Sequence, residues 1–558
     1  MKGSKALLKL LEKEGVQCIF GYPGAATIPI YDDLLDSGIR NVLVRHEQCA
    51  AHMADGYARA TGRPGVCMAT SGPGSTNLIT GVATAFADSS PMLVLTGQVS
   101  TGLLGNAAFQ EVDAFSLMMP ITKHNFRVLR ADEIPEAIGR GMNIAKNGRM
   151  GPVHVDLPVD VLRSEVDEAR MGESFPVAEP REDLSQLSEA LRILISAERP
   201  LILAGGGVIW SNASANLTAL AEMLLAPVAT TLMGKGSIPE EHPLCLGMLG
   251  MHGRESARRA MRESDVILAV GTRFSDRTIP TCSEIPSGTR IVQVDIDSIE
   301  ARRNPRTTAG LVGDAGRVLG LLRKGLGRAR PETAWTLRIR EMQRICRCEI
   351  DIDSEPIKPQ KAMHELGKLL ADDVIITTEV GQNQMWAAHF LKVKHPRQFI
   401  TSGGFGTMGF GLPAAIGVKM ARPEYKVIDV AGDGSLLMVF QELATAMAED
   451  LPVTIVLINN GWLGMVRQWQ KLFWGGRFSG TRLSGNPDFV QLAEAFGAEG
   501  VRVERPSELA EAYQRAMTSD VPFIVDVVCD PEEDVLPMTP SGKGSKDMVY
   551  GKCNWSYP

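Results

Sequence analysis

The chain has 558 residues, a net charge of −7, 44% hydrophobic residues and 22% charged residues. At roughly 100–200 residues per domain this length predicts about three domains, and the composition is that of a globular protein with a sizeable core. The acidic balance without a long basic run argues against a nucleic-acid partner, and no apolar run reaches the ~18 residues that a membrane-spanning helix needs.

The cysteines and the first segment indicate the compartment. The chain has nine cysteines, an odd and scattered set without a CxxC pair, which argues against a disulfide framework or a zinc site and favours free thiols in a reducing compartment. The segment MKGSKALLKLLEKEG carries charges at helical spacing and ends at Gly15, which predicts an amphipathic first helix rather than a signal peptide. We therefore expect a cytoplasmic protein.

Short apolar segments alternate with helical ones through the first third of the chain. VQCIFGYPG is typical of a strand and a glycine turn, and NVLV of a strand before the helical HEQCAAHMADGYARATG. GVCMATSGPGSTNLITGVATAFADSS follows as strand, turn and helix, and MLVLTGQ and VHVDLP complete the set. Strands without polar alternation, separated by helices, predict a parallel sheet covered on both faces. We assign residues 1–165 to this block.

Two further α/β blocks follow. The charged, strand-poor residues 163–182 predict a linker, after which LILAGGGV, PVATTL, DVILAVGTRF and IVQVDID form a second block over residues 183–325. The arginine-rich stretch 323–358 predicts a second linker with some helix, and a third block over 358–535 has the layout of the first. Residues 536–558 show little periodicity and predict a tail or lid. The expected fold class is α/β, with three doubly wound parallel-sheet domains.

Polar side chains follow two strands of the third block. Asp433 comes after KVIDVAG, within GDGS, and Asn460 comes after LPVTIVLI. The carboxyl ends of parallel strands meet at one rim, where carboxylate and amide oxygens suit a Mg²⁺ that binds phosphates. Gly432 and Gly434 let the backbone approach a diphosphate at the following helix start. Taken singly, Asp433 could cap a helix and Asn460 could fill a turn, but together they resemble the diphosphate–Mg²⁺ motif of thiamine-diphosphate enzymes.

Two more signals bear on such a cofactor. Gly404-Phe-Gly406-Thr-Met-Gly409 matches the dinucleotide fingerprint, but no acidic residue follows a second strand ~20 residues on. We therefore expect Met408 to pack under a cofactor, with core packing as the alternative. Thiamine also needs a carboxylic acid at its pyrimidine ring, and Glu47 is the candidate. By spacing alone, a helix-dipole carboxylate is the better interpretation of Glu47.

A run of motifs then identifies a family. GYPG, RHEQ, ADGYARATG, TSGPGSTN, FQEVD, GPVHVDLP, TRFSDR, GTMGFGLPAAIG, GDGS and NNGWLGMVRQWQ occur in this order. With them the chain resembles the catalytic subunits of the acetohydroxyacid synthase (acetolactate synthase) family, over residues 5–540. The resemblance implies a pyrimidine-binding domain at 1–165, a central FAD-binding domain at 183–325 and a diphosphate- and Mg²⁺-binding domain at 358–535. It also implies a homodimer or homotetramer with active sites between subunits, and a possible regulatory small subunit.

The resemblance also implies site residues, carried over onto matching positions of this sequence. Glu47 would activate the cofactor, and Asp433, Asn460 and the backbone carbonyl of Trp462 would hold Mg²⁺. Thiamine diphosphate would contact Pro23, Gln382, Met408, Gly434, Ser435, Gly464 and Met465. The 2-oxo acid pocket would be lined by Phe109, Gln110, Met251, Arg277 and Trp469. FAD, structural rather than redox-active, would contact Arg149, Gly205, Gly206, Gly207, Thr231, His252, Gly271, Arg273, Asp295, Asp314 and Ala315.

Two of these side chains bear on the reaction. The Arg277 guanidinium can hold the carboxylate of a second 2-oxo acid by paired hydrogen bonds, with a surface salt bridge as the alternative. Trp469 suits discrimination between a methyl and an ethyl group, worth ~1–3 kcal/mol, with core packing as the alternative.

The expected reaction decarboxylates pyruvate and ligates its two-carbon unit to pyruvate or 2-oxobutyrate, the first common step of branched-chain amino acid synthesis. A related 2-oxo acid decarboxylase, a glyoxylate carboligase, a pyruvate oxidase and an inactive binding subunit are the alternatives. Glyoxylate carboligases lack the acid at Glu47, and a plain decarboxylase does not need Arg277 or Trp469. Intact Glu47, Asp433 and Asn460 argue against an inactive subunit.

The chain departs from the family pattern at four positions. Val159 stands where the family usually has lysine, which removes a positive charge from the access channel, and Ala25 adds a methyl group beside the cofactor. Asn383 stands for histidine and Ser275 for aspartate. We expect these changes to affect substrate preference and inhibitor sensitivity more than cofactor binding.

Overall fold

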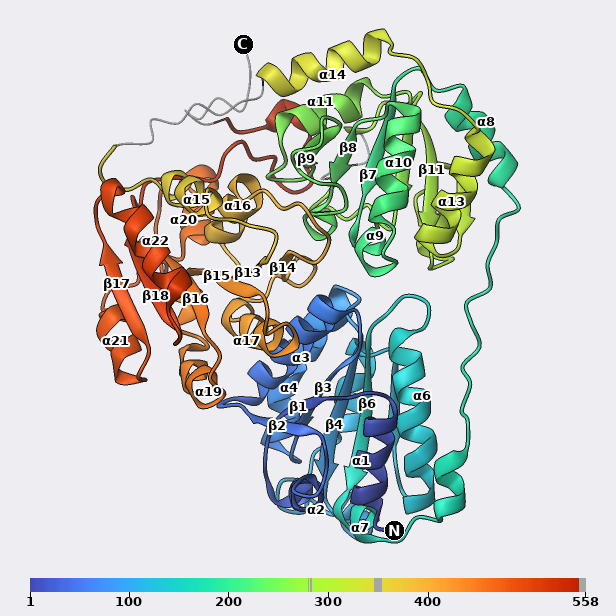
Figure 1. Ribbon diagram of the computed structural model, residues 1–558, viewed down its shortest axis with the longest axis vertical. Coiled ribbons are helices and arrows are strands. Elements are labelled where there is room, and N and C mark those ends of the chain that lie inside the picture. Colours follow the sequence, from blue (N-terminus) through green and yellow to red (C-terminus); the bar gives the residue numbers. More distant parts are fainter. Residues whose placement is uncertain (280, 282–283, 346–353, 551–558) are drawn as a thin grey trace.

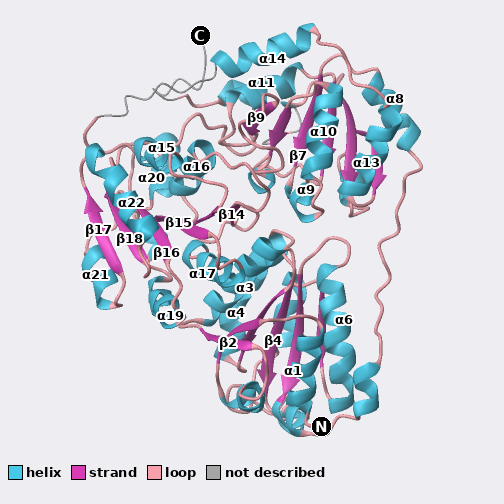
Figure 2. Ribbon diagram, viewed as in Figure 1, coloured by secondary structure: helices cyan, strands magenta, loops and turns pink. Residues whose placement is uncertain are grey.

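The three α/β blocks each form a six-stranded parallel sheet in the computed structural model (Figure 1). The structure describes residues 1–279, 281, 284–345 and 354–550. Helices flank every sheet, as Figure 2 shows, and the expected α/β class with three doubly wound domains is confirmed. Within the described residues, no helix is long and apolar enough to cross a membrane. Parts of the second predicted linker and of the predicted tail lie outside the described residues.

The first sheet has the strand order β2-β1-β3-β4-β6-β5. Its strands are β1 (Cys18–Tyr22), β2 (Arg40–Leu43), β3 (Gly65–Ala69), β4 (Met92–Gln98), β5 (His124–Arg127) and β6 (Pro152–Pro158). Its helices are α1 (Gly3–Lys13), α2 (Ile28–Leu34), α3 (Glu47–Thr61), α4 (Pro73–Ala87), α5 (Ala114–Met118), α6 (Ile134–Lys146) and α7 (Val159–Arg163). Because β3 and β4 are buried along their whole length, their sequences are almost continuously apolar. The equally buried β6 does alternate, and its polar side chains His154 and Asp156 both hydrogen-bond Thr96 of β4.

The third sheet repeats this order as β14-β13-β15-β16-β18-β17. Its strands are β13 (Val374–Thr378), β14 (Phe399–Thr401), β15 (Lys426–Gly432), β16 (Val453–Asn459), β17 (Glu499–Val503) and β18 (Phe523–Val528). Its helices are α15 (Pro359–Gly367), α16 (Gln382–Phe390), α17 (Gly411–Ala421), α18 (Asp433–Leu436), α19 (Leu443–Ala448), α20 (Gly464–Phe473), α21 (Phe489–Ala495) and α22 (Leu509–Thr518). The predicted likeness of the first and third blocks therefore extends to their topology.

The central sheet differs, with the order β12-β11-β10-β7-β8-β9. Its strands are β7 (Pro200–Ala204), β8 (Val228–Thr230), β9 (Cys245–Met248), β10 (Val266–Val270), β11 (Arg290–Asp295) and β12 (Thr307–Val312). Its helices are α8 (Leu187–Ile195), α9 (Gly206–Trp210), α10 (Ser214–Leu224), α11 (Glu255–Glu263), α12 (Glu300–Arg303) and α13 (Ala315–Leu326), with α14 (Ala334–Ile345) beyond them. This is the order of dinucleotide-binding sheets, whose ligand crevice lies where the strand order reverses, here between β7 and β10.

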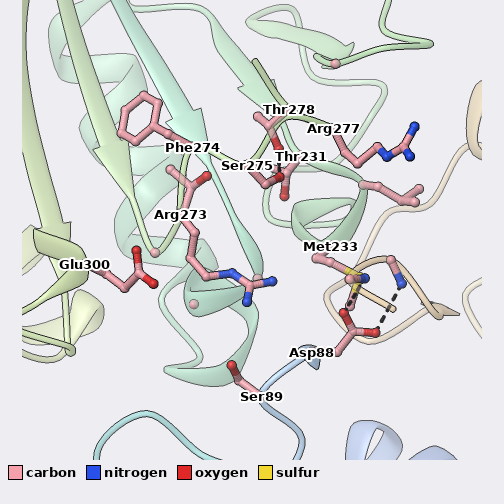
Figure 3. Close-up of a pocket in the computed structure, with 18 of the residues that line it drawn as sticks. Asp88, Ser89, Thr231, Met233, Arg273, Phe274, Ser275, Arg277, Thr278 and Glu300 are labelled. Carbon is pink, nitrogen blue, oxygen red and sulfur yellow. Dashed lines mark hydrogen bonds between the residues drawn. The ribbon is translucent and has the colours of Figure 1, made fainter. Parts of the chain in front are cut away.

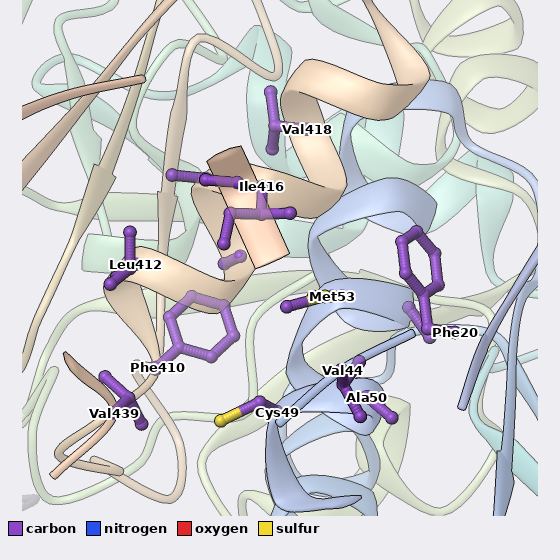
Figure 4. Packing of buried hydrophobic residues seen from close by; sticks show 14 of the residues in the cluster. Phe20, Val44, Cys49, Ala50, Met53, Phe410, Leu412, Ile416, Val418 and Val439 are labelled. Atoms are coloured by element: carbon purple, nitrogen blue, oxygen red, sulfur yellow. The ribbon is translucent and has the colours of Figure 1, made fainter. Parts of the chain in front are cut away.

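Helices α3 and α17 join the first and third domains. A Cβ on Gly56 of α3 would lie 2.3 Å from the carbonyl oxygen of Ala414, and one on Gly417 of α17 would lie 2.0 Å from that of Met53. Glycine therefore lets the two backbones touch. Buried side chains of both domains form one apolar cluster around this contact, including Phe20, Met53 and Phe410 (Figure 4).

The central domain is linked to the rest of the molecule by the long segment between α7 and α8 and by contacts of the C-terminal end. Between α7 and α8 the chain contains only the short 3₁₀ turn Glu168–Gly172 and runs along the edge of the molecule in Figure 1. Near the other end of the chain, the backbone N–H of Thr539 donates to the carbonyl of Met251 at 2.9 Å. The tail residues that the structure describes thus contact the central domain.

Candidate functional site

Three strands of the third sheet end in polar side chains at one rim. Ligands of parallel sheets bind beyond the carboxyl ends of the strands, where the order reverses. In this sheet the reversal lies between β13 and β15. Gln382 begins α16 after β13, Asp433 begins α18 after β15, and Asn460 directly follows β16. The structure brings these three side chains together at the rim.

Asp433 is a buried carboxyl with directed hydrogen bonds. Asp433 is only 2% exposed. Its Oδ2 accepts from the backbone N–H of Gly461 and from Nδ2 of Asn486, each at 2.9 Å. Burial raises the pKa of this carboxyl to about 6, which the hydrogen bonds oppose. Among the described residues no cationic side chain forms an ion pair with Asp433. A hard divalent cation would offset this desolvation, so the oxygen ligands expected here fit Mg²⁺.

Gly464 keeps the start of α20 close to the same rim. A Cβ at this position would lie 2.1 Å from Oε1 of Gln382 and 2.9 Å from Nδ2 of Asn460. Asn460 Nδ2 donates to Gln382 Oε1 at 3.4 Å, and Gln382 Nε2 donates to Oε1 of Gln468 at 2.9 Å. A side chain at this position would displace the amides of Gln382 and Asn460, so glycine leaves room for the narrow cradle that these residues form, of the kind that a diphosphate needs.

Met408 lies on a loop fixed by a buried carboxyl. Its Cε is 3.9 Å from the position that a Cβ on Gly434 would take, next to Asp433. Glu379, which has no exposed surface, accepts from the backbone N–H of Gly409 at 2.7 Å and of Leu412 at 3.3 Å. Burial raises the pKa of Glu379 to about 7. No sequence pattern predicts this support, because Glu379 follows an ordinary buried strand.

The other end of the same loop is held by the first domain. Asp88 accepts from the backbone N–H of Gly404 at 2.6 Å and of Gly403 at 3.1 Å. Nη2 of Arg59 donates to Asp88 Oδ2 at 3.0 Å. The dashed hydrogen bonds of Asp88 are visible in Figure 3, beside the cavity described below.

Glu47 begins α3 in the first domain, next to two other predicted residues. Its Oε2 accepts from Nδ2 of Asn77 on α4 at 2.9 Å. Gly72, with φ +61°, precedes α4, and a Cβ there would lie 2.8 Å from the carbonyl oxygen of Gln110. Gln110 itself has φ +58°, and the neighbouring Phe109 is 87% exposed. These residues form a second polar group, and no hydrogen bond or ion pair of the described residues joins it to Asp433.

A cavity of about 1090 Å³ lies between the central domain and the first and third domains. Its lining includes residues after β7 and after β10, which is the expected ligand crevice of this topology. Ten of the eleven residues expected near FAD line it: Arg149, Gly206, Gly207, Thr231, His252, Gly271, Arg273, Asp295, Asp314 and Ala315. Gly205 is the exception, because it packs under the cavity floor, where a Cβ would lie 2.1 Å from the carbonyl oxygen of Gly271.

Basic and acidic side chains both line this cavity, and two of the basic ones, Arg149 and Arg273, lie close together. Figure 3 shows the Arg273 side chain extending into the cavity, with Phe274 pointing away from it. Burial lowers the pKa of Arg273, and the nearby Arg149 lowers it further. At the end of β11, burial raises the pKa of Asp295 to about 6. Two neighbouring guanidinium groups suit a diphosphate, so size, topology and charge all fit a dinucleotide such as FAD.

The same cavity also contains three of the residues expected to bind substrate. Met251, Arg277 and Trp469 line it together with Met465 of α20. Nη1 of Arg277 lies 3.0 Å from Sδ of Met251, and its guanidinium carbon is 5.9 Å from the centre of the Trp469 ring. Nε1 of Trp469 is buried without a hydrogen-bond partner in the described part of the chain. Helix α20 thus connects the Asp433 rim to this cavity.

The predicted residues therefore fall into three groups in a single chain. The first group lies at or beside the rim of the third sheet: Asp433, Asn460, Trp462, Gln382, Met408, Gly434, Ser435, Gly464 and Met465. Within it, Ser435 Oγ donates to the carbonyl of Gly432 at 3.1 Å. Glu47, Phe109, Gln110 and the exposed Pro23 belong to the first domain, and the structure places all four outside the cavity. Asn77 and Asn486 were missed by the sequence reasoning, because a lone asparagine far along the chain is typical of a turn or helix surface.

Asn383 is the departure whose structural effect is clearest. It donates to the backbone carbonyls of Glu379 at 3.2 Å and Val430 at 2.8 Å, so it connects the ends of β13 and β15. Ser275 lies on the exposed turn before Arg277, and Val159 begins α7. Ala25 is exposed, at the start of a 3₁₀ turn after β1.

Comparisons with known proteins agree with this arrangement. Three family models match: the N-terminal TPP-binding domain of thiamine pyrophosphate enzymes at residues 1–117, their central domain at 187–322 and their C-terminal TPP-binding domain at 379–527. A probable acetolactate synthase large subunit of Methanocaldococcus jannaschii is 49% identical, covering 98% of this chain and 95% of the relative. The Escherichia coli acetolactate synthase isozyme 3 large subunit is 42% identical, with 99% of both chains covered. The chain therefore belongs to the acetolactate synthase large-subunit family of thiamine-diphosphate enzymes.

Proposed function

We propose that this chain makes 2-acetolactate from pyruvate. It decarboxylates one pyruvate and ligates the two-carbon unit to a second 2-oxo acid, either pyruvate or 2-oxobutyrate, as the first common step of branched-chain amino acid synthesis. The observation that carries this proposal is the continuity of two sites. Helix α20 begins at the Asp433 rim with Gly464 and carries Trp469 into the cavity, beside Arg277.

The rim binds the cofactor in this proposal. Asp433 and the amide oxygen of Asn460, with the backbone carbonyl of Trp462, hold Mg²⁺, and Gln382 and Gly464 border the diphosphate. When bound, thiamine diphosphate supplies a carbon nucleophile and stabilises the negative charge left by decarboxylation. Met408 supports it from the loop fixed by Glu379.

Glu47 would hydrogen-bond the pyrimidine ring of the bound cofactor, and Asn77 orients the Glu47 carboxyl. Because Glu47 and Asp433 lie in separate groups within one chain, we propose a homodimer or homotetramer in which the first domain of one subunit completes the rim of another. Gln110 and Phe109 then approach the cofactor together with Glu47.

The cavity serves two purposes in this proposal. Its larger part binds FAD as a structural group, with Arg149 and Arg273 facing the diphosphate. Its other end orients the second substrate: Arg277 pairs with the carboxylate, and Trp469 contacts the alkyl group. A pocket of this kind distinguishes methyl from ethyl by about 1–3 kcal/mol.

The same proposal assigns a function to each domain, a cellular location and a partner. We assign pyrimidine binding to residues 1–165, FAD binding to 183–325 and diphosphate and Mg²⁺ binding to 358–535, with a tail at 536–558. We propose a cytoplasmic enzyme, and a regulatory small subunit as a partner, since the relatives are named large subunits.

Product analysis by NMR tests the function. The purified protein is incubated with pyruvate, Mg²⁺, thiamine diphosphate and FAD, and we expect 2-acetolactate. Acetaldehyde in its place would make the chain a decarboxylase, and acetate or acetyl phosphate formed with hydrogen peroxide would make it a pyruvate oxidase. Ligation of glyoxylate but not pyruvate would indicate a glyoxylate carboligase.

The assignment of Arg277 has its own test. Arg277→Ala should release a carbonyl product without ligation, and Arg277→Lys, which keeps the charge but loses the paired hydrogen bonds, should recover part of the ligation. Arg340→Ala is the matched control, because Arg340 is an exposed arginine of α14 that pairs with Glu332. Unchanged 2-acetolactate formation by Arg277→Ala would rule out the assigned part in catalysis.

A further inference from the structure

We propose that Asn486 is a positioning residue that determines which oxygen of Asp433 binds the divalent cation. The inference rests on the proposed function, in which Asp433 is a metal ligand. Asn486 lies 53 residues after Asp433 and donates from Nδ2 to Oδ2 of its carboxyl at 2.9 Å. The remaining oxygen, Oδ1, is then the one through which the carboxylate can bind a cation.

Two donors converge on the same oxygen. The backbone N–H of Gly461 also donates to Oδ2 of Asp433 at 2.9 Å. Two donors from different parts of the chain hold Oδ2 in place, and the loss of one of them weakens that restraint. Because Asp433 is only 2% exposed, water cannot readily replace a lost donor.

Gly461 lies in the turn that carries Asn460. It has φ +70° and immediately follows Asn460, whose Oδ1 accepts from the backbone N–H of Trp462 at 3.0 Å. The second donor comes from the segment before α21, which is itself hydrogen-bonded to the turn that carries Asn460, so the two donors form one connected support for the carboxylate.

Asn486 is itself held from both sides. Before it, the backbone N–H of Leu483 donates to the carbonyl of Gly461 at 2.9 Å, and that of Leu463 donates to the carbonyl of Thr481 at 2.8 Å. After it, Asp488 accepts from the first backbone N–H groups of α21 and ends the segment.

A cation–π contact fixes the same segment farther back. The guanidinium carbon of Arg467 lies 5.0 Å from the Trp462 ring and 5.1 Å from the Phe478 ring. Arg467 is 3% exposed, so this contact is desolvated and contributes more than a surface one. The Asn486 amide is therefore presented to Asp433 by a prearranged segment rather than by a free loop.

The amide is the side chain that this position requires. It donates a hydrogen bond without adding charge, so it neither competes with the cation, as lysine would, nor repels the Asp433 carboxylate, as aspartate would. Groups that orient a metal ligand through hydrogen bonds affect metal affinity about 10–100-fold when removed.

The test measures cation binding directly. Mn²⁺ is titrated into the full-length protein with thiamine diphosphate, and free Mn²⁺ is followed by electron paramagnetic resonance. We expect Asn486→Ala to weaken Mn²⁺ binding about 10–100-fold, and Asn486→Gln, which keeps the donor, to recover part of that loss. Ser484→Ala is the matched control, because Ser484 is exposed in the same segment, and it should bind Mn²⁺ like the wild type.

The outcomes separate this inference from the proposed function. Wild-type Mn²⁺ affinity in Asn486→Ala, or equal losses in Asn486→Ala and Asn486→Gln, would overturn the positioning role. A folded wild type that binds no Mn²⁺ with thiamine diphosphate would overturn both proposals. Weakened binding in Asn486→Ala by a protein that forms no 2-acetolactate would support the inference and refute the reaction. A kcat that recovers at saturating Mg²⁺ in Asn486→Ala would add support, since general misfolding would not be rescued.

Discussion

The substitution Arg59→Met measures how firmly the first and third domains are held together. Arg59 is 6% exposed and donates to both oxygens of Asp55, at 2.7 and 2.9 Å, and to Asp88 at 3.0 Å. It also donates to the carbonyl of Thr401 in the third domain at 2.7 Å, and its guanidinium carbon lies 5.1 Å from the Phe410 ring. Methionine keeps much of the side-chain volume but leaves two buried carboxylates without their cation.

The size of the effect follows from this arrangement. Removing one partner of a buried ion pair costs about 3–5 kcal/mol, because the remaining charge stays desolvated. At ~2–4 °C per kcal/mol for domains of this size, the unfolding midpoint should fall by roughly 6–20 °C. Arg140→Met is the control. Arg140 forms a partly exposed pair with Glu136 at 2.8 Å, worth less than about 1 kcal/mol.

Differential scanning calorimetry of the full chain at one scan rate is the assay. A companion variant that combines Arg59→Met with Asp55→Asn removes one of the two uncompensated charges and leaves Asp88 to accept from the backbone N–H groups of Gly403 and Gly404, so it should recover part of the lost midpoint. The reasoning fails if Arg59→Met unfolds within 2 °C of the Arg140→Met control, or if the double variant is no more stable than Arg59→Met alone.

Two further predictions test packing and titration. Gly56→Ala should destabilise the protein by ~1–3 kcal/mol, because its Cβ would meet the carbonyl oxygen of Ala414 at 2.3 Å. Gly102→Ala is the control and should not destabilise it, because open space surrounds Gly102. Equal denaturation midpoints of the two variants would contradict this prediction. Burial raises the pKa of Glu379 from 4.5 to about 7, so between these pH values the folded chain keeps a proton that the unfolded chain releases. The free energy of unfolding should therefore fall as the pH rises from about 4.5 to about 7. Urea denaturation across this range should show a flatter curve for Glu379→Gln, and a curve parallel to that of the wild type would refute the titration.

Local sequence patterns predicted the elements of this protein well. The segment KVIDVAG coincides with β15 (Lys426–Gly432), and LPVTIVLI contains most of β16, because strands buried on both faces leave continuous apolar runs. The same continuity hides strand order. The distinct strand order of the central sheet was not predicted, because continuously apolar strands have similar sequences wherever they lie in a sheet.

The candidate site was predictable only where its residues lie in short motifs. GDGS and Asn460 lie at strand ends, so their meeting at one rim could be anticipated. The neighbouring Asn459, the last residue of β16, donates to Asp526 at 2.9 Å. Supporting residues such as Asn77, Glu379 and Asn486 act across long sequence separations, and no local pattern distinguishes them from ordinary polar residues. Within one chain Glu47 and Asp433 lie in separate groups, and the assembly proposed above, which would bring Glu47 of one subunit to the Asp433 rim of another, is not recorded in any pattern of a single sequence.

The loop that carries Met408 is attached to two domains at once. Its first residues are hydrogen-bonded to Asp88 of the first domain, and its last residues to Glu379 of the third. A small rotation between these domains must therefore either break the bonds of Asp88 or drag Met408 with it. Any molecule that binds the outer surface of the first domain and rotates it would alter the cofactor environment without entering the pocket. The backbones of α3 and α17 touch at Gly56 and Gly417, so there is no free space between the domains at this contact. Even a small rotation would therefore be transmitted to the loop that carries Met408.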